Sequence, residues 1–262
     1  MSNKVLNNKN IVISAAAEGI GWSIAKKCLD NGAKVFVSDK NKDAINIIKN
    51  QKKYKKNLYT KVLDANNYRE VEKYFLFIKH HIKKIDGLIN NVGIAGPTSK
   101  IENIKINDWR ETIDTNINSH FYFTKFATSL LKKKSGGSII NVSSTAGLYG
   151  FPYRSPYAAT KWAIIGITKT LAMEMGKHNI RVNAICPGSV EGNRMKRVIR
   201  AKSKISGLSY KSIKKDLESM VSLNSFVSKE DISNMAFFLL TDEAKKISGQ
   251  IMTVDGNTEK MN

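Results

Sequence analysis

Residues 10–21 read NIVISAAAEGIG, a short apolar run that leads into a turn of small residues. The pattern predicts a buried strand at Asn10–Ser14 and a helix from Gly19 to Asn31, which Gly32 ends. Between a first strand and a first helix, such a turn lets backbone N–H groups approach a pyrophosphate at the positive end of the helix dipole. Glycines in this place also serve plain packing, so the stretch alone leaves both interpretations open.

The rest of the chain repeats the alternation of strand and helix. Further buried strands are predicted at Lys34–Ser38, Leu58–Leu63, Gly87–Asn90, Ser138–Val142, Ile180–Ile185 and Ile251–Val254. Helices are predicted at Asp43–Gln51, Tyr68–Ile82, Asp108–Leu131 and Tyr157–Gly176. Such alternation builds a parallel sheet covered on both faces, with right-handed crossovers. We therefore expect an α/β fold, a Rossmann-like doubly wound sheet of seven parallel strands in a single domain over residues 1–262.

Only Asn193–Val227 departs from this alternation. It is a basic, helix-like insertion between the sixth strand and the next helix. Open α/β sheets bind ligands beyond the carboxyl ends of their strands, where this insertion begins. The sequence therefore predicts a substrate loop at about residues 189–227.

Asp39 directly follows the second predicted strand, eighteen residues after Gly21. A carboxylate in this place reaches the two ribose hydroxyls of an adenosine, and it repels a 2′-phosphate. The residue therefore favours NAD over NADP. The alternative is that Asp39 caps the next helix, with Asp43 in the following turn.

Tyr157 lies four positions before Lys161 in a predicted helix and thirteen positions after Ser144. Residues four apart share one face of a helix. A tyrosine near its usual pKa of about 10 is a poor acid or base at neutral pH, whereas a neighbouring ammonium lowers that pKa. The pair therefore suits proton transfer, although Tyr-x-x-x-Lys by itself is a weak motif.

Six motifs together carry a family resemblance: Gly19-Ile20-Gly21, Asn90-Asn91-Val92-Gly93, Asn116, Ser143-Ser144, Tyr157-x-x-x-Lys161 and Pro187-Gly188. With them in this order, the chain resembles the classical, single-domain branch of the short-chain dehydrogenase/reductase family from about Asn8 to Asn257. No single motif is decisive, but six in register are specific. The resemblance implies hydride transfer between an oxygen-bearing carbon and a nicotinamide.

The resemblance also implies roles for the matching residues. Tyr157 is the expected acid/base, Lys161 lowers its pKa and holds the nicotinamide ribose, and Ser144 holds the substrate oxygen. Asn116 is expected to hold a water that links Lys161 to solvent. The expected cofactor contacts are Ser14, Glu18, Gly19, Ile20, Gly21, Asp39, Asp64, Ala65, Asn90, Val92, Gly93, Tyr157, Lys161, Pro187, Gly188 and Val190.

Three positions depart from the family pattern. Ser14-Ala15 replaces the usual Thr-Gly, and because alanine tolerates a left-handed backbone poorly, a differently shaped turn is expected. Val92 replaces an alanine, which is a mild change. Val190-Glu191-Gly192 stands where a threonine often bonds the carboxamide, and Ser189, the backbone or Asn193 could take its place.

Four of the seven arginines fall near the expected substrate pocket: Arg154, Arg194, Arg197 and Arg200. Arginine forks suit carboxylate, sulfonate or phosphate groups. We expect Arg154 and Arg194, with Ser144 and Tyr157, to contact a small, polar, anionic hydroxy compound. The alternative is that these arginines are solvated helix faces or subunit contacts.

The expected function is therefore an NAD-dependent oxidoreductase of alcohols. A 3-oxoacyl-[acyl-carrier-protein] reductase is the main rival, although Asp39 disfavours the NADPH that such reductases prefer, and a sugar dehydrogenase stays open. A catalytically silent nucleotide-binding regulator would have a broken catalytic set, whereas this set is whole. The resemblance also suggests a homotetramer in which the helices Asp108–Leu131 and Tyr157–Gly176 pack across one interface.

The net charge is +21, yet only seven of the 43 basic residues are arginines, and the lysines are spread along the chain. Recognition of phosphates and bases relies heavily on arginine, so no nucleic-acid partner is expected. No apolar run of about 18 residues marks a membrane span. Cys28 and Cys186 form no paired motif, the four histidines are scattered, and no secretion signal is evident, so we expect no metal and a cytoplasmic location.

Overall fold

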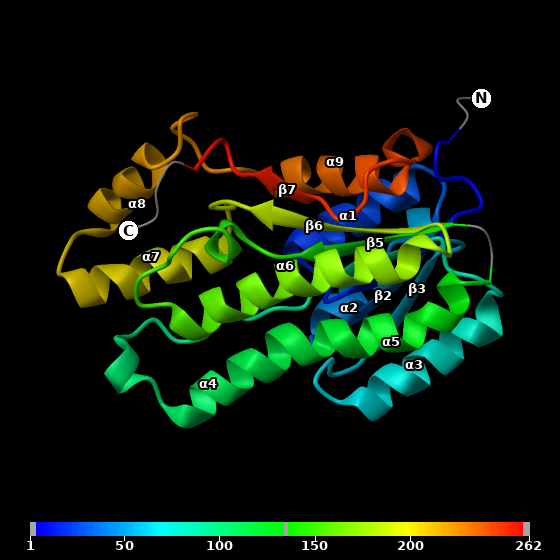
Figure 1. Ribbon diagram of the computed structural model, residues 1–262, viewed down its shortest axis with the longest axis horizontal. Helices are drawn as coiled ribbons and strands as arrows, with labels where there is room; N and C mark the ends of the chain where they lie inside the picture. The colour runs from blue at the N-terminus through cyan, green and yellow to red at the C-terminus, as the bar shows by residue number, and fades with distance from the viewer. Residues whose placement is uncertain (1–3, 134–135, 259–262) are drawn as a thin grey trace.

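The computed structural model of the protein describes residues 4–133 and 136–258. Within these residues, seven strands form one sheet in the order β3-β2-β1-β4-β5-β6-β7, with every neighbouring pair parallel (Figure 1). The strands are β1 (Asn10–Ser14), β2 (Lys34–Asp39), β3 (Leu58–Val62), β4 (Gly87–Asn90), β5 (Gly137–Val142), β6 (Ile180–Pro187) and β7 (Ile251–Val254). The predicted Rossmann-like parallel sheet is therefore confirmed.

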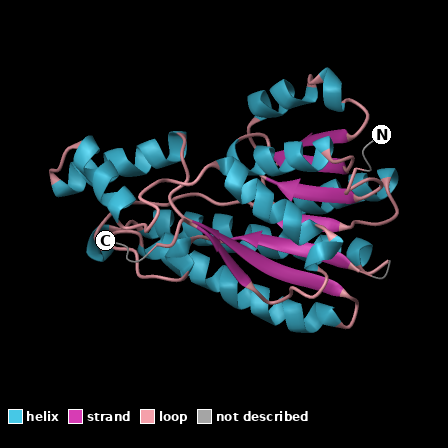
Figure 2. Ribbon diagram, turned by 90° about the horizontal axis from the view of Figure 1, so that it is seen from above, coloured by secondary structure: helices cyan, strands magenta, loops and turns pink. Residues whose placement is uncertain are grey.

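Helices cover both faces of this sheet (Figure 2). One buried apolar cluster receives side chains from α1 (Gly19–Asp30), α2 (Lys42–Lys49) and α9 (Lys229–Leu240). A second cluster receives them from α3 (Tyr68–His81), α5 (Ser119–Leu131) and α6 (Ser155–Gly176). Short 3₁₀ segments complete the connections at η1 (Lys52–Tyr54), η2 (Ile101–Asn103), η4 (Thr145–Gly147) and η5 (Asp242–Ala244).

The strands show why the sequence reads as continuous apolar runs. In β1, Ile11 and Ile13 enter the first cluster, whereas Val12, between them, enters the second. Successive strand residues point to opposite faces, so a sheet covered on both sides buries every one of them. The predicted strands and the shorter helices lie within two residues of the observed ones.

The predicted continuous helix Asp108–Leu131 is wrong in detail. The observed segment begins two residues earlier, as α4 (Ile106–Ile113), and continues through a π-helical stretch, η3 (Asp114–Asn118), before α5. A π turn inserts an extra residue into the helix and often marks a functional site. Here it contains the buried Asn116.

The predicted insertion folds into two helices beyond the end of the sheet, α7 (Asn193–Ser206) and α8 (Tyr210–Ser219) (Figure 2). Gly207 ends α7 with a left-handed φ of 73°, and Ser209 caps α8. The pair has a small apolar cluster of its own, formed by Ile199, Ile213, Leu217 and Met220. A bridge between Val190 and Val227 closes the base of the insertion.

Across the described part of the chain, no helix combines the length and the apolar character that crossing a bilayer requires.

Candidate active site

The strand order reverses between β1 and β4, and open α/β sheets bind nucleotides at such a switch point. Asn91, the first residue after β4, links the two strand ends here. Its Nδ2 donates to the Ala15 carbonyl at 2.8 Å, and its backbone N–H donates to Ser14 Oγ at 3.0 Å. The sequence prediction did not include Asn91 among the site residues, although the repeated asparagine at 90–91 was a usable signal.

The turn after β1 keeps a tight shape despite the alanine in it. Ala15 adopts φ 49°, and Gly19 adopts φ 57°. A left-handed conformation costs a non-glycine residue about 1–2 kcal/mol, so the turn is held under strain by its neighbours. At Gly21, a Cβ atom would lie 2.5 Å from the Ala15 carbonyl oxygen, which excludes any side chain. Ala15 thus takes the left-handed conformation that alanine tolerates poorly.

Asp39 ends β2 beside this turn. Its Oδ2 accepts a hydrogen bond from the Ala17 N–H at 3.1 Å, and its Oδ1 accepts one from Asn41 N–H at 3.0 Å. The cap of α2 is Asn41, whose side chain accepts from the Ala44 N–H at 3.1 Å, so Asp39 is not the helix cap. The carboxylate is thus fixed at the turn, where a ribose is expected. A cradle closed to side chains beside a fixed carboxylate fits an adenine dinucleotide.

Two of the predicted cofactor residues turn their side chains into the sheet instead. Ser14 is buried, and its hydroxyl accepts from Asn91. Asn90 donates to Thr124 Oγ1 at 3.0 Å and to Asn141 Oδ1 at 2.8 Å, which ties β4 to α5 and β5. Both side chains therefore link neighbouring elements at the carboxyl ends of the strands.

The other predicted cofactor residues lie along the carboxyl ends of the strands. Glu18 is exposed and precedes α1, and Ile20 is half-buried in its first turn. Asp64 and Ala65 follow β3, with Asp64 exposed. After β4, Val92 is buried, whereas Gly93 lies against Asn116 and Lys161. Pro187 ends β6, and Val190 forms the bridge to Val227. Between them, Gly188 lies so close to Asp255 that an added Cβ atom would be 2.9 Å from Asp255 Cα.

Tyr157 and Lys161 lie one turn apart near the start of α6. The helix begins at Ser155, and Pro156 occupies its first turn, where a missing N–H is tolerated. The buried Lys161 Nζ lies 5.6 Å from the centroid of the Tyr157 ring and donates to the Val142 carbonyl at 3.0 Å. Ser144 precedes η4, and its Oγ accepts from the Ala146 N–H at 3.1 Å.

The charges around Tyr157 favour its phenolate. Burial alone raises the pKa of Tyr157, but the ammonium of Lys161, the guanidinium of Arg194, a hydrogen bond with Ser144 and the charge of Arg154 together bring it below its ordinary value. Burial lowers the pKa of Lys161, and the Tyr157 phenolate opposes that shift. Each group of the pair therefore stabilises the charged form of the other.

Asn116 connects the loop after β4 to α6. Its Oδ1 accepts from the Ile94 N–H at 2.7 Å, and its Nδ2 donates to the Ile94 carbonyl at 3.1 Å and to Thr160 Oγ1 at 3.0 Å. Thr160 in turn donates to the Tyr157 carbonyl at 2.7 Å. The side-chain amide thus positions the catalytic helix against Gly93. Thr160 was missed, although it lies inside the Tyr-x-x-x-Lys motif.

The two predicted substrate arginines both reach the Tyr157 ring. Arg154 Cζ lies 5.0 Å from the ring centroid, and Arg194 Cζ lies 5.8 Å from it. Arg154 is buried and donates to the Ala95 carbonyl at 2.7 Å, whereas Arg194 is exposed and donates to the Gly93 carbonyl at 3.2 Å. Lys202 of α7 joins them, with its Nζ 5.2 Å from the Phe151 ring. Among so many lysines, no sequence signal singles it out.

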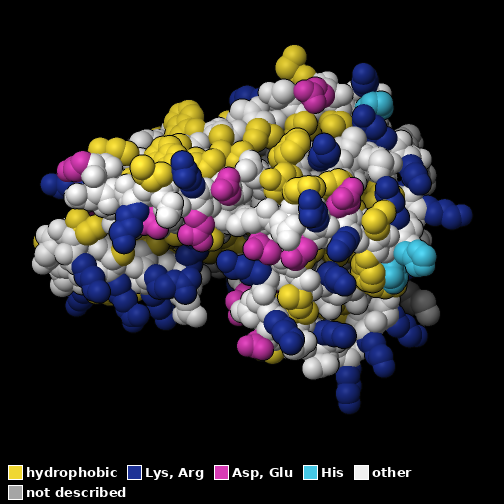
Figure 3. All heavy atoms as spheres, turned by 90° about the horizontal axis from the view of Figure 1, so that it is seen from below, with side chains coloured by type: hydrophobic (Ala, Val, Ile, Leu, Met, Phe, Trp, Pro, Cys, Tyr) yellow, Lys and Arg dark blue, Asp and Glu magenta, His cyan; other side chains and the backbone are white. Residues whose placement is uncertain are grey.

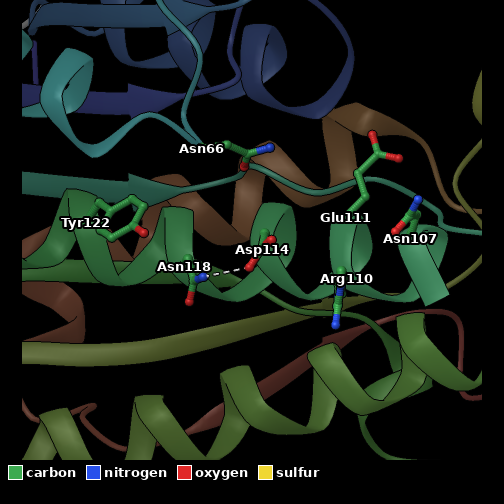
Figure 4. Close-up of a pocket in the computed structure, with 7 residues that line it drawn as sticks. All are labelled: Asn66, Asn107, Arg110, Glu111, Asp114, Asn118 and Tyr122. Atoms are coloured by element: carbon green, nitrogen blue, oxygen red, sulfur yellow. Dashed lines mark hydrogen bonds between the residues drawn. The ribbon is translucent and has the colours of Figure 1, made fainter.

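A separate polar hollow of about 520 Å³ lies against α4, η3 and α5 (Figure 4). It is lined by Asn66, Asn107, Arg110, Glu111, Asp114, Asn118 and Tyr122. Asn118 donates to Asp114 there at 3.0 Å. Its lining includes neither Tyr157 nor Lys161, so it is distinct from the catalytic cluster.

Comparison with known proteins agrees with this geometry. A family model described as enoyl-(acyl carrier protein) reductase matches residues 15–257. A 3alpha-hydroxysteroid dehydrogenase of Mediterraneibacter gnavus is 31% identical over 258 residues, which cover 96% of this chain and 97% of that protein. A trans-4-hydroxycyclohexanecarboxylate dehydrogenase of Sinomonas cyclohexanicum is 32% identical over 255 residues, 95% of this chain and 92% of that protein.

A solved structure shares the fold over almost the whole chain. It is a variant of actinorhodin polyketide ketoreductase with NADPH, and it matches with a TM-score of 0.90 and 25% identity, covering 96% of this chain and 97% of that chain. The fold and the site thus define a nicotinamide-dependent oxidoreductase that acts on CH–OH groups. The chain belongs to the short-chain dehydrogenase/reductase family, as its motifs predicted.

Proposed function

We propose that the protein interconverts an alcohol and its carbonyl compound with NAD, and that Tyr157 is the acid and base of the reaction. The observation that carries this proposal is the position of the Lys161 ammonium, 5.6 Å from the centroid of the Tyr157 ring, where its charge lowers the pKa of the phenol. In the direction of oxidation, the phenolate accepts the hydroxyl proton of the substrate, and Ser144 Oγ holds the same oxygen. When bound, NAD would supply the acceptor for the hydride that leaves the carbon bearing this oxygen.

The cofactor would lie across the switch point of the sheet. The turn from Gly19 to Gly21 would take the pyrophosphate, and Asp39 the adenosine ribose. Asp64 and Ala65 would border the adenine. Lys161 and Gly93 would border the nicotinamide ribose, and Pro187, Gly188 and Val190 the nicotinamide itself. In this arrangement Lys161 both binds the cofactor and lowers the pKa of Tyr157.

Asn116 acts in this proposal as a positioning residue. Its amide is engaged by Ile94 and Thr160, which fixes α6 relative to the loop after β4. The proton relay through a water near Asn116 stays a prediction.

The proposed substrate is a small, polar secondary alcohol or its ketone, held between the 145–156 loop and residues 189–227. By their names, both relatives described above act on ring compounds that carry a hydroxyl group. We treat residues 1–262 as one functional unit, in which α7 and α8 cover the substrate side. The unpaired, buried Cys28 and Cys186 support a reducing, cytoplasmic compartment.

Replacing Tyr157 by Phe should lower kcat by about 10³-fold, because general acid–base catalysis contributes on that order. NADH formation, followed by absorbance with a panel of secondary alcohols, measures the loss. The same variant should bind NAD with little change, as titration of protein fluorescence would report. Retention of the wild-type rate by Tyr157→Phe would refute the proposed mechanism.

The pH dependence should report the pKa of Tyr157. For alcohol oxidation, kcat/KM should rise with pH and level off above a pKa that lies below the ordinary value of tyrosine, because the phenolate is the base. Lys161→Met removes the main charge that lowers this pKa, so the inflection should move to higher pH. Lys169→Met, an exposed lysine of the same helix, is the control. An inflection that stays in place in Lys161→Met contradicts the assigned role.

Asp39 supports NAD over NADP through its charge. Asp39→Asn keeps an acceptor for the Ala17 N–H but removes the charge, so the ratio of kcat/KM with NADP to that with NAD should rise by about tenfold or more. The neighbouring Asp43→Asn, in the first turn of α2, should leave the ratio unchanged. The NADPH in the ketoreductase structure makes this test necessary. A wild-type enzyme that prefers NADP would end the NAD proposal.

We propose a homotetramer from the exposed apolar side chains of α4, α5 and α6. Trp109 and Phe121 are exposed on α4 and α5, and on α6 Trp162 is 52% and Met173 is 86% exposed. Positions 162 and 173 are separated by three helical turns, so they share one face. Figure 3 shows hydrophobic side chains gathered in a band along one side of the molecule. Apolar surface of this kind marks an interface.

Trp162→Glu should therefore convert the tetramer into smaller species, because it places a charge in the interface. Light scattering coupled to size-exclusion chromatography measures the mass. Leu76→Glu is the matched control, since Leu76 is 58% exposed on α3. A monomeric wild-type protein, or equal effects of both variants, would exclude this interface.

A further inference from the structure

Three cationic side chains lie over two aromatic rings of the site, Tyr157 and Phe151. Arg154 comes from the start of α6, and Arg194 and Lys202 come from α7. Arg154 Cζ lies 5.0 Å from the centroid of the Tyr157 ring and 5.5 Å from that of the Phe151 ring. Lys202 Nζ lies 5.2 Å from the centroid of the same Phe151 ring. Arg194 approaches Tyr157 from the other helix, at 5.8 Å. Two positive charges therefore lie beside Tyr157, and a third lies beside the neighbouring Phe151.

Arg154 is an unusual buried charge. Arg154 is only 2% exposed, and its Nε has no hydrogen-bond partner in the structure. The ion pairs found in the described residues join Lys53 to Asp30, Lys84 to Asp86 and Lys214 to Glu218, so none includes Arg154 or Arg194. A buried charge normally needs a partner that offsets its loss of hydration.

The cations also act on one another. The Arg194 charge lowers the pKa of Arg154, after the larger effect of burial, and the Arg154 charge does the same to Lys202. Asp216 of α8 opposes the shift at Lys202, and the Tyr157 phenolate opposes it at Arg154. By comparison, the partly buried Arg181 has Asp242 as its opposing charge. An anion placed among the three cations would relieve this repulsion.

An open surface hollow borders one ring of this cluster. Phe151, whose ring Arg154 and Lys202 contact, also lines a surface hollow of about 510 Å³ with Tyr149, Gly150 and Pro152. Arg194 is exposed, and its Nη1 donates one hydrogen bond, to the Gly93 carbonyl at 3.2 Å. Its guanidinium has further donors that a ligand can accept from.

We propose that Arg154, Arg194 and Lys202 bind a carboxylate, sulfonate or phosphate group of the substrate, so that the enzyme acts on small anionic hydroxy or oxo compounds. Arginine forks recognise such groups by paired, charge-assisted hydrogen bonds. Because Arg154 and Arg194 lie 5.0 Å and 5.8 Å from the centroid of the Tyr157 ring, an anion bound to them would lie close to the reacting carbon. This inference rests on the proposed function, in which Tyr157 and Ser144 hold the substrate oxygen.

The test uses binding, so it does not depend on turnover. Calorimetry on the NAD-saturated enzyme measures the affinities of cyclohexanecarboxylate, propane-1-sulfonate and propyl phosphate, with cyclohexylmethanol as the neutral counterpart. At least one anion should bind about tenfold or more tightly than the alcohol, and its affinity should fall with added salt. Arg194→Gln and Arg154→Gln should each lower the affinity for that anion by about tenfold or more, because each variant removes a charged hydrogen bond.

Two variants control for structure. Arg197→Gln removes an exposed arginine of the same helix and should leave the affinity unchanged. Arg154→Lys keeps the charge without the fork and should recover part of the affinity lost in Arg154→Gln. Should Arg154→Gln fail to fold, the exposed Arg194 still provides the test.

The inference is overturned if none of the three anions binds more tightly than cyclohexylmethanol, or if Arg197→Gln weakens binding as much as Arg194→Gln. Failure of the proposed function looks different, because it appears as a Tyr157→Phe enzyme with full activity. An enzyme that oxidises neutral alcohols through Tyr157 but does not prefer anions would retain the function and lose the inference.

Discussion

The ammonium of Lys161 is buried in a region with little access to water, and its neighbours are arranged to keep it charged there. The Val142 carbonyl accepts a hydrogen bond from it, and the Tyr157 phenolate offsets the effect of burial on its pKa. The backbone at this point is fixed as well, because Ser143 Oγ donates to the Lys161 carbonyl at 2.8 Å. The start of α6 is therefore held against the end of β5 by Lys161, the residue proposed to lower the pKa of Tyr157.

Lys161 also contacts the loop after β4, on the proposed cofactor side of the site. Gly93 lies against Lys161 and Asn116, and Asn116 pairs with the backbone of Ile94. A π turn in the middle of a long helix contains this asparagine. A displacement of α6 would thus move the loop after β4, so the proposed proton transfer and the proposed cofactor binding would depend on the same packed residues.

Most of the fold was predictable because its signals are local and strong. Strands such as Asn10–Ser14 are apolar throughout, which only a sheet covered on both faces explains. The order of the motifs then indicated the catalytic set and its family. The remaining features arise from tertiary contacts. No propensity marks the π turn at Asn116, Ala15 is held left-handed by its surroundings, and Arg154 is buried although its charge predicts exposure.

Asp39 shows how one side chain can tie two properties together. One of its oxygens accepts from the Ala17 N–H and therefore shapes the turn. In the proposed function, the charge of the same carboxylate favours NAD over NADP. A lineage that exchanged this carboxylate for a residue suited to a 2′-phosphate would also lose the acceptor for Ala17. Such a change would need a second substitution that supplies another acceptor, so under the proposed function a switch of cofactor preference would require two coupled steps.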